Sequence, residues 1–92
     1  MKLIELRNGG GWACVDDKYY DYLNQFEWII GTDGYCSRRK WPGDPIGISH
    51  LHREVARLVW EKPPPMLKHI DGIKTNNQLS NLFPIFIQLK RY

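Results

Sequence analysis

The chain has 92 residues, a mean hydropathy of −0.49 and a formal net charge of +3. This length is enough for one domain with a modest core, near the size at which folding stability becomes marginal. No apolar run approaches the roughly 20 residues of a membrane span, which excludes a transmembrane helix. The first residues, KLIELRN, do not have the form of a signal peptide, so we expect a soluble cytoplasmic domain spanning residues 1–92.

Residues 1–47 form a β-rich lead-in with a short helix. Residues 2–7 alternate apolar and charged side chains, the Asn-Gly-Gly-Gly run at 8–11 predicts a hairpin turn, and residues 12–15 form the returning strand. Asp16 or Asp17 then caps a helix from Lys18 to about Phe26. A second hairpin joins strands at 28–32 and 35–41. Helical spacing predicts a core-facing stripe of Tyr19, Tyr22, Leu23 and Phe26, with base stacking as the less favoured use of these rings.

Residues 48–92 begin with a central helix that Ser49 caps and that runs to about Trp60, where three prolines end it. His50 and His52 are two positions apart, which on a helix points their rings away from each other. His50, Arg53 and Arg57 form a basic ridge. The tail 83–92 is rich in β-branched and aromatic residues, which predicts a strand or extended segment. The expected buried stripe of the helix is Leu51, Val55, Leu58 and Val59.

The charge is distributed unevenly along the chain. Residues 1–37 hold three basic and six acidic side chains, whereas residues 38–92 hold ten basic and four acidic ones. Such asymmetry is typical of a one-sided nucleic-acid-binding surface, the alternative being an ordinary solvated face. Cys14 and Cys36 are expected to be free thiols, and no Cys/His pairing predicts a zinc site.

The segment 68–82, KHIDGIKTNNQLSNL, carries the most specific pattern. It resembles the ββα-metal core of phage-type HNH homing endonucleases, which reads roughly D-H-I-[DN]-G-N-K-x-[DN]-N-R-x-x-N-L. The lead-in also resembles that of the same enzymes, and the His52-Arg53 pair matches theirs. The predicted fold class is therefore α+β: one small domain with N-terminal β-hairpins and a short helix, a central helix, and a degenerate HNH-like core. The matching positions are His69, Ile70, Asp71, Gly72, Lys74, Asn76 or Asn77, Asn81 and Leu82.

The resemblance implies metal-assisted phosphodiester hydrolysis, with His69 as general base, Asn81 orienting its ring and a last ligand near Lys90. The first metal ligand falls on Lys68, and an ammonium has no lone pair to donate. At about 4 Å it would repel a divalent ion by several kcal/mol, whereas it suits a phosphate oxygen. We therefore expect no enzymatic activity, no metal and no cofactor, with His69 and Asn81 vestigial.

As a whole, the chain also resembles small phage anti-CRISPR proteins that inhibit the type I-F surveillance complex. The resemblance implies a partner in the host cytoplasm, a bacterial RNA-guided nucleoprotein complex, whose guide-RNA or DNA phosphates the protein contacts and whose target DNA binding it blocks. No membrane is involved. The residues expected to contact phosphates are Arg38, Arg39, Lys40, Arg53, Arg57, Lys68, Lys74, Lys90 and Arg91.

Three alternatives remain open from the sequence. The first is a metal-dependent HNH nicking endonuclease, in which Asp71 or a water replaces the missing ligand. The second is a sequence-specific DNA-binding repressor. The third is structural: His69 is a hydrogen-bonded strand histidine, and the Asn-rich run is a turn and a helix cap.

Overall fold

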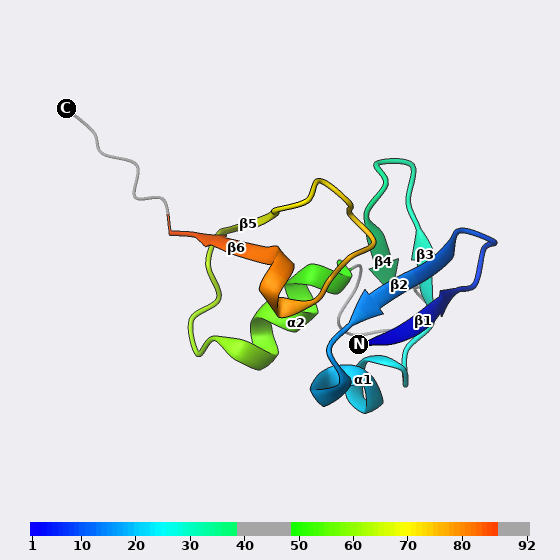
Figure 1. The fold of residues 1–92 in the computed structure, drawn as a ribbon, viewed down its shortest axis with the longest axis horizontal. Helices are drawn as coiled ribbons and strands as arrows, with labels where there is room; N and C mark the ends of the chain where they lie inside the picture. The colour runs from blue at the N-terminus through cyan, green and yellow to red at the C-terminus, as the bar shows by residue number, and fades with distance from the viewer. Residues whose placement is uncertain (39–48, 87–92) are drawn as a thin grey trace.

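Four strands of the N-terminal half form a mixed sheet with the order β2-β1-β3-β4 (Figure 1). The computed structural model describes residues 1–38 and 49–86. Within them the sheet is followed by a two-stranded antiparallel ribbon, and α-helices precede β3 and follow β4. The small single α+β domain predicted from the sequence is confirmed. The elements are β1 Lys2–Leu6, β2 Gly11–Val15, α1 Asp17–Leu23, β3 Trp28–Ile30, β4 Cys36–Arg38, α2 Leu51–Val59, β5 Met66–His69, the 3-10 helix η1 Leu79–Asn81 and β6 Leu82–Ile85.

The turn between β1 and β2 is glycine-rich for two physical reasons. Gly9 and Gly11 have φ angles of 79° and 91°, a region that residues with a Cβ rarely adopt. A Cβ on Gly10 would lie 2.3 Å from the Cγ2 of Ile30. Asn8 then ties the turn to β3, since its Nδ2 donates to the Ile30 carbonyl at 2.9 Å and its Oδ1 accepts from the Ile30 N–H at 3.1 Å.

Helix α1 is shorter than predicted and starts without a side-chain cap. Its last backbone bond runs from the Asn24 N–H to the Tyr20 carbonyl, after which the chain turns toward β3. Asp16 precedes the helix but makes no capping bond to it. Its Oδ2 instead accepts from the backbone N–H of Leu79, 63 residues further on, at 2.7 Å. The expected helix cap is therefore a tie between distant parts of the chain.

Helix α2 begins at Leu51 rather than after a Ser49 cap. The Ser49 hydroxyl donates to the Glu54 carboxylate at 3.1 Å, and Glu54 is 3% exposed. The expected apolar stripe is partly wrong, because Leu58 is 38% exposed. The helix instead buries Leu51, Glu54, Val55 and Ala56, a face at i, i+3, i+4 and i+5 that accommodates the carboxylate because Ser49 and Arg57 pair with it.

The segment between β5 and β6 docks on the edge of the four-stranded sheet. The Cys14 N–H on β2 donates to the Thr75 carbonyl, and the Asn77 N–H donates to the Cys14 carbonyl, both at 2.8 Å. Strand β6 confirms the first part of the extended tail, while residues 87–92 lie outside the described chain. Strands β5 and β6 thus form an antiparallel ribbon, and β2 holds the loop between them.

The core lies between the sheet and the helices, with Leu6, Leu23, Trp28, Leu51 and Val55 among its members. Trp28 is fully buried, and its indole N–H donates to the Leu23 carbonyl at 2.8 Å. Both cysteines are free, as predicted. Neither α1 nor α2, nor any other helix in the described residues, is long and apolar enough to cross a bilayer.

Candidate nucleic-acid interface

His69 ends β5 with its ring turned into the protein, where it is 6% exposed. Its Nε2 lies 2.9 Å from the Oδ1 of Asn77, which is 1% exposed. The Nδ2 of Asn77 donates to the Lys74 carbonyl at 3.2 Å, and this bond fixes which end of the amide faces His69. The amide presents an oxygen, so Nε2 of His69 carries the ring proton and donates it to Asn77.

Asn81, expected to orient His69, has a different role. Its Nδ2 donates to the Asp71 carboxylate and to the Asn76 carbonyl, both at 2.8 Å, and its Oδ1 accepts from the Asp71 N–H. Asn81 therefore holds the turn after β5, while Asn77 contacts the histidine. The expected role of Asn81 is wrong because the loop folds back on itself and brings residue 77, four positions earlier, under the ring.

Asp71 is also fixed within this loop. Its Oδ1 accepts from the Ile73 N–H at 2.8 Å and from Asn81, and its Oδ2 accepts from the Asn76 amide at 2.9 Å. The Asn76 bond first, and then the Ile73 N–H, lower the pKa of Asp71 because they favour the charged form. These three bonds fix the orientation of the Asp71 carboxylate within the loop, and its Oδ2 accepts only one of them.

Two imidazoles, of His50 and His52, and the phenol of Tyr35 gather beside His69, an arrangement that the sequence did not predict. The His52 ring centroid lies 5.3 Å from that of His69 and 5.5 Å from that of His50. The Tyr35 ring centroid lies 5.1 to 5.8 Å from the centroids of the His50, His52 and His69 rings. The expectation that His50 and His52 point apart is wrong, because His50 precedes the helix and pairs with Ser37 as an extension of β4.

Within this cluster, His52 is held neutral. Burial, followed by the neighbouring His69 and His50 rings and Arg53, lowers the pKa of His52 to about 4. At neutral pH the cluster therefore presents an uncharged His52 ring, and added protons are opposed by its surroundings. His50 lies at the rim, 37% exposed, with its Nε2 3.8 Å from the Asp33 carboxylate.

Lys68 and Lys74 are brought together with His69 around one pocket of about 320 Å³. Lys68 is exposed on β5, on the face opposite to His69. The Lys74 ammonium donates to the Asp33 carbonyl at 2.7 Å and lies 4.4 Å from the Tyr35 ring centroid. An ammonium has three N–H donors, so Lys74 retains donors for an anion. The pocket is lined by Tyr35, Met66, Leu67, Lys68, His69, Gly72, Lys74 and Ile85.

The other predicted phosphate ligands that the structure describes, Arg38, Arg53 and Arg57, do not line this pocket. Arg38 is 2% exposed, and its guanidinium lies 4.7 Å from the centroid of the Phe26 ring, so the expected phosphate contact is wrong for this buried side chain. Arg53 donates to the Pro64 carbonyl at 2.7 Å and is half-buried. Arg57 is exposed and pairs with Glu54 at 3.3 Å. Outside the described residues lie Arg39, Lys40, Lys90 and Arg91.

The donor set around His69 does not fit the divalent ion that an HNH endonuclease holds. The position before the histidine carries an ammonium, and Asp71 is engaged in its own loop. Across residues 1–38 and 49–86, no three His, Cys, Asp or Glu side chains lie so that they could share a metal ion. No hydrolytic step through a metal is therefore derived for this site.

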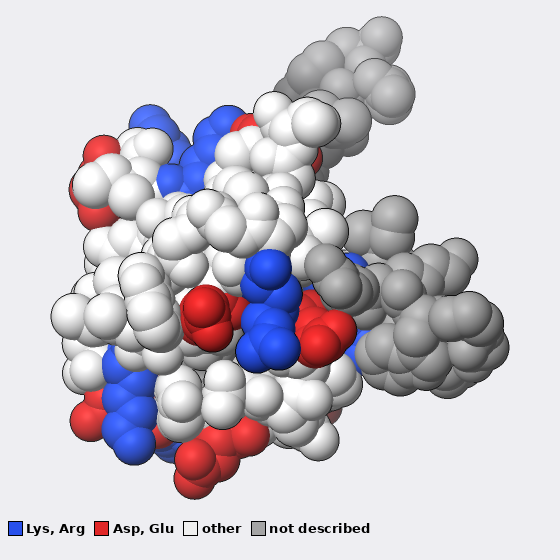
Figure 2. Space-filling model, turned by 90° about the vertical axis from the view of Figure 1, so that its right-hand side faces the viewer, with Lys and Arg blue, Asp and Glu red and all other residues white. Residues whose placement is uncertain are grey.

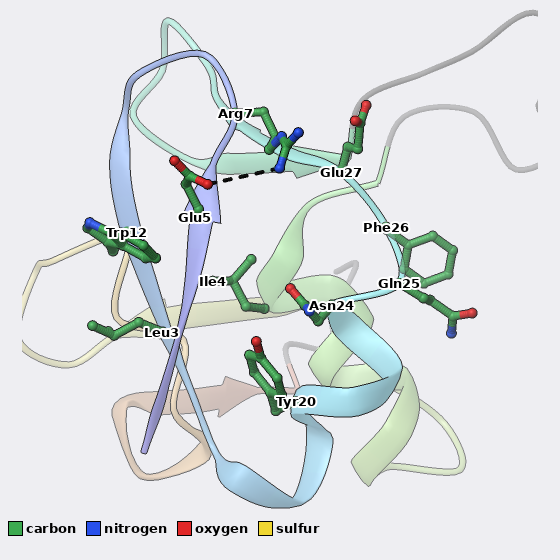
Figure 3. A pocket seen from close by; sticks show the side chains of 10 residues that line it. All are labelled: Leu3, Ile4, Glu5, Arg7, Trp12, Tyr20, Asn24, Gln25, Phe26 and Glu27. Atoms are coloured by element: carbon green, nitrogen blue, oxygen red, sulfur yellow. Dashed lines mark ion pairs between the residues drawn. The ribbon is translucent and has the colours of Figure 1, made fainter.

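A second pocket, of about 370 Å³, lies between β1 and the α1–β3 connection (Figure 3). Its rim mixes charges, since Arg7 pairs with Glu5 at 3.9 Å and Glu27 lies beside them. The molecular face in Figure 2 likewise shows acidic and basic side chains next to one another on a largely uncharged surface. These mixed charges do not suit a polyanion, whereas the Lys68–Lys74 pocket is lined by two lysines.

Comparison of the chain with protein-family models, with curated proteins and with solved structures gives no match. The likeness to HNH endonucleases therefore rests on the spacing within residues 68–82.

Proposed function

We propose that this protein binds nucleic acid or a nucleoprotein through a degenerate HNH-type core and does not cleave it. One observation carries the proposal: β5 presents the Lys68 ammonium to solvent and turns the adjacent His69 ring inward. In a hydrolytic site the imidazole must offer a lone pair to water. Here Nε2 donates to Asn77, and the lone pair on Nδ1 belongs to a ring that is 6% exposed, which limits the access of water to it.

Phosphate contact is what the exposed groups of this site can do. Lys68 is a mobile point charge, and Lys74 adds a second ammonium around the same pocket. Such contacts position a protein on nucleic acid without reading its sequence. The finer proposal, from the whole-chain resemblance, is inhibition of a bacterial RNA-guided surveillance complex of type I-F by blocking its binding of target DNA.

The experiment is a DNA-loading assay with the purified guide-RNA complex. Saturating protein is expected to bind stoichiometrically and to prevent loading of labelled target DNA, with no cut strand on a denaturing gel. Lys68→Glu is expected to weaken this effect, because it replaces an attractive charge by a repulsive one. If DNA loading is unaffected at saturating protein, the inhibitor proposal is contradicted. The broader proposal of nucleic-acid binding is tested separately by measuring binding to free nucleic acid.

The endonuclease alternative is supported by one observation, the neutral His52 ring 5.3 Å from His69. A general base must be unprotonated at the working pH, which His52 is, although a pKa of about 4 makes it a weak base. Plasmid nicking with added Mg²⁺ or Mn²⁺, compared between wild type, His69→Ala and His52→Ala, tests it. Nicking by the wild type that both variants lose would replace the binding proposal by an enzymatic one.

A further inference from the structure

The β5–β6 ribbon has one face against the protein and one face toward solvent. The register pairs Met66 with Ile85 and Lys68 with Phe83, and places Leu67 opposite Pro84 and His69 opposite Leu82. Because side chains alternate along a strand, the first two pairs share one side and the last two pairs the other. Burial agrees: His69 and Leu82 are buried, whereas Met66 and Phe83 are 53% and 56% exposed. We call Met66, Lys68, Phe83 and Ile85 the outer ribbon face.

The outer ribbon face places an exposed phenyl ring directly opposite an ammonium. Residues opposite each other on an antiparallel pair have Cβ atoms about 5 Å apart, so Phe83 and Lys68 form one contiguous patch. Aromatic rings that stack bases, next to cations that hold the backbone, are how proteins bind single strands without sequence preference. In a duplex the base faces are already stacked and unavailable to such a ring.

We propose that the outer ribbon face binds single-stranded nucleic acid, with an unpaired base stacked on Phe83 and a phosphate on Lys68. The inference rests on the proposed function and names its ligand class. The pocket that carries Lys74 continues from the edge of the ribbon, since Met66, Lys68 and Ile85 line both. Lys74 is placed to take a second phosphate of the same strand.

Charge distinguishes this ligand from a second copy of the chain. None of the four residues of the outer ribbon face is acidic, and its one charge is Lys68. A two-fold contact across this face would bring identical patches together. Two Lys68 ammoniums would then meet without a carboxylate from either patch between them, which is unfavourable. A polyanion with apolar base faces complements both the charge and the ring.

The experiment measures the affinity of the purified chain for a fluorescent single strand of about 12 nucleotides and for the matching duplex. The wild type is expected to prefer the single strand. Phe83→Leu keeps an apolar side chain and removes the ring, and it is expected to weaken single-strand binding about 10-fold while leaving duplex binding unchanged. Phe83→Tyr keeps an aromatic ring and should bind the single strand as tightly as the wild type. Trp12→Leu is the matched control, since Trp12 is also 56% exposed but lies on β2.

A second readout separates stacking from a structural effect. A 2-aminopurine in the strand is expected to be quenched by the wild type and by Phe83→Tyr, and to stay bright with Phe83→Leu. If Phe83→Leu and the wild type bind the single strand with equal affinity, the inference about Phe83 is overturned. The proposed function still holds in that case if Lys68→Gln weakens nucleic-acid binding. The inference is also overturned if the wild type binds the duplex more tightly than the single strand or binds neither oligonucleotide. Self-association of the chain that Phe83→Leu abolishes overturns it as well.

Discussion

At the scale of single residues, His69 shows how one neighbour decides the chemistry of a side chain. Its Nε2 donates to the Asn77 amide oxygen, which leaves Nδ1 as the ring nitrogen with the lone pair. The amide cannot rotate without losing the bond from its Nδ2 to the Lys74 carbonyl. A buried amide left without these partners would cost about 1–3 kcal/mol, so the tautomer is locked by the loop.

His52 gives the residue-scale prediction of pH dependence. Its folded pKa of about 4 lies below its ordinary value of 6.5, so the unfolded chain binds the proton more readily. The free energy of unfolding should be at its full value above about pH 6.5 and fall as the pH approaches about 4. The loss should be on the order of 2 kcal/mol, less than the full shift because the ring is partly exposed.

Urea denaturation between pH 4 and pH 7 measures this effect. His52→Gln is expected to lose less stability on acidification than the wild type. His50→Gln is the matched control, because the His50 side chain is 37% exposed at the rim of the cluster. This variant should lose nearly as much stability on acidification as the wild type. Identical acid profiles for His52→Gln and wild type would show that burial of His52 does not oppose its protonation.

At the scale of elements, the loop between β5 and β6 is held by bonds to a strand more than 60 residues earlier. Cys14 exchanges backbone bonds with Thr75 and Asn77, and Asp16 accepts from Leu79. These bonds position Asn77 under His69 and Lys74 beside Tyr35. The interface therefore depends on β2, although none of its proposed ligand-binding residues belongs to that strand.

Asp16→Ala is predicted to loosen this docking. It removes a charged acceptor from the Leu79 N–H and should lower the free energy of unfolding by about 1.5–3 kcal/mol. Asp17→Ala is the control, because the exposed Asp17 carboxylate pairs with the N-terminal ammonium in solvent and its loss should lower the free energy of unfolding by less than the loss of Asp16 does. Chemical denaturation of both variants measures the difference, and equal losses would contradict the proposed tie.

At the scale of the whole molecule, the charge asymmetry along the chain does not become a basic hemisphere among residues 1–38 and 49–86. Arg38 is buried and Arg57 is paired with Glu54. Lys74 donates to the backbone carbonyl of Asp33, and the face in Figure 2 mixes both signs. Lys68 is exposed on the ribbon and lines the pocket. Binding by this molecule should therefore depend on a few localised charges rather than on its net charge.

The salt dependence of nucleic-acid binding tests that view. Lys68→Gln is predicted to reduce the slope of log K against log salt by about 1, because one phosphate contact is lost. Lys62→Gln removes the same charge from an exposed position before the prolines and should leave the slope unchanged. Fluorescence anisotropy over a salt series measures both. Equal slopes for the two variants would mean that net charge, and not the Lys68 site, controls binding.

Much of this architecture follows from local sequence signals. Alternation and glycines placed the β1–β2 hairpin, helical spacing placed both helices, and the Asp-Gly turn after His69 marked the end of β5. The sequence also shows directly that the cation Lys68 precedes His69. These features were predictable because each depends on neighbours within a few residues.

Other features were decided by the tertiary structure. The burial of Arg38, the gathering of His50, His52 and His69 around one tyrosine, and the choice of Asn77 over Asn81 all join segments far apart in the chain. No periodicity encodes how a loop docks on a distant strand, because the free energy of docking comes from contacts that exist once every element is in place. Sequence alone determined which elements form and that a cation precedes His69; packing determined which side chains face the solvent.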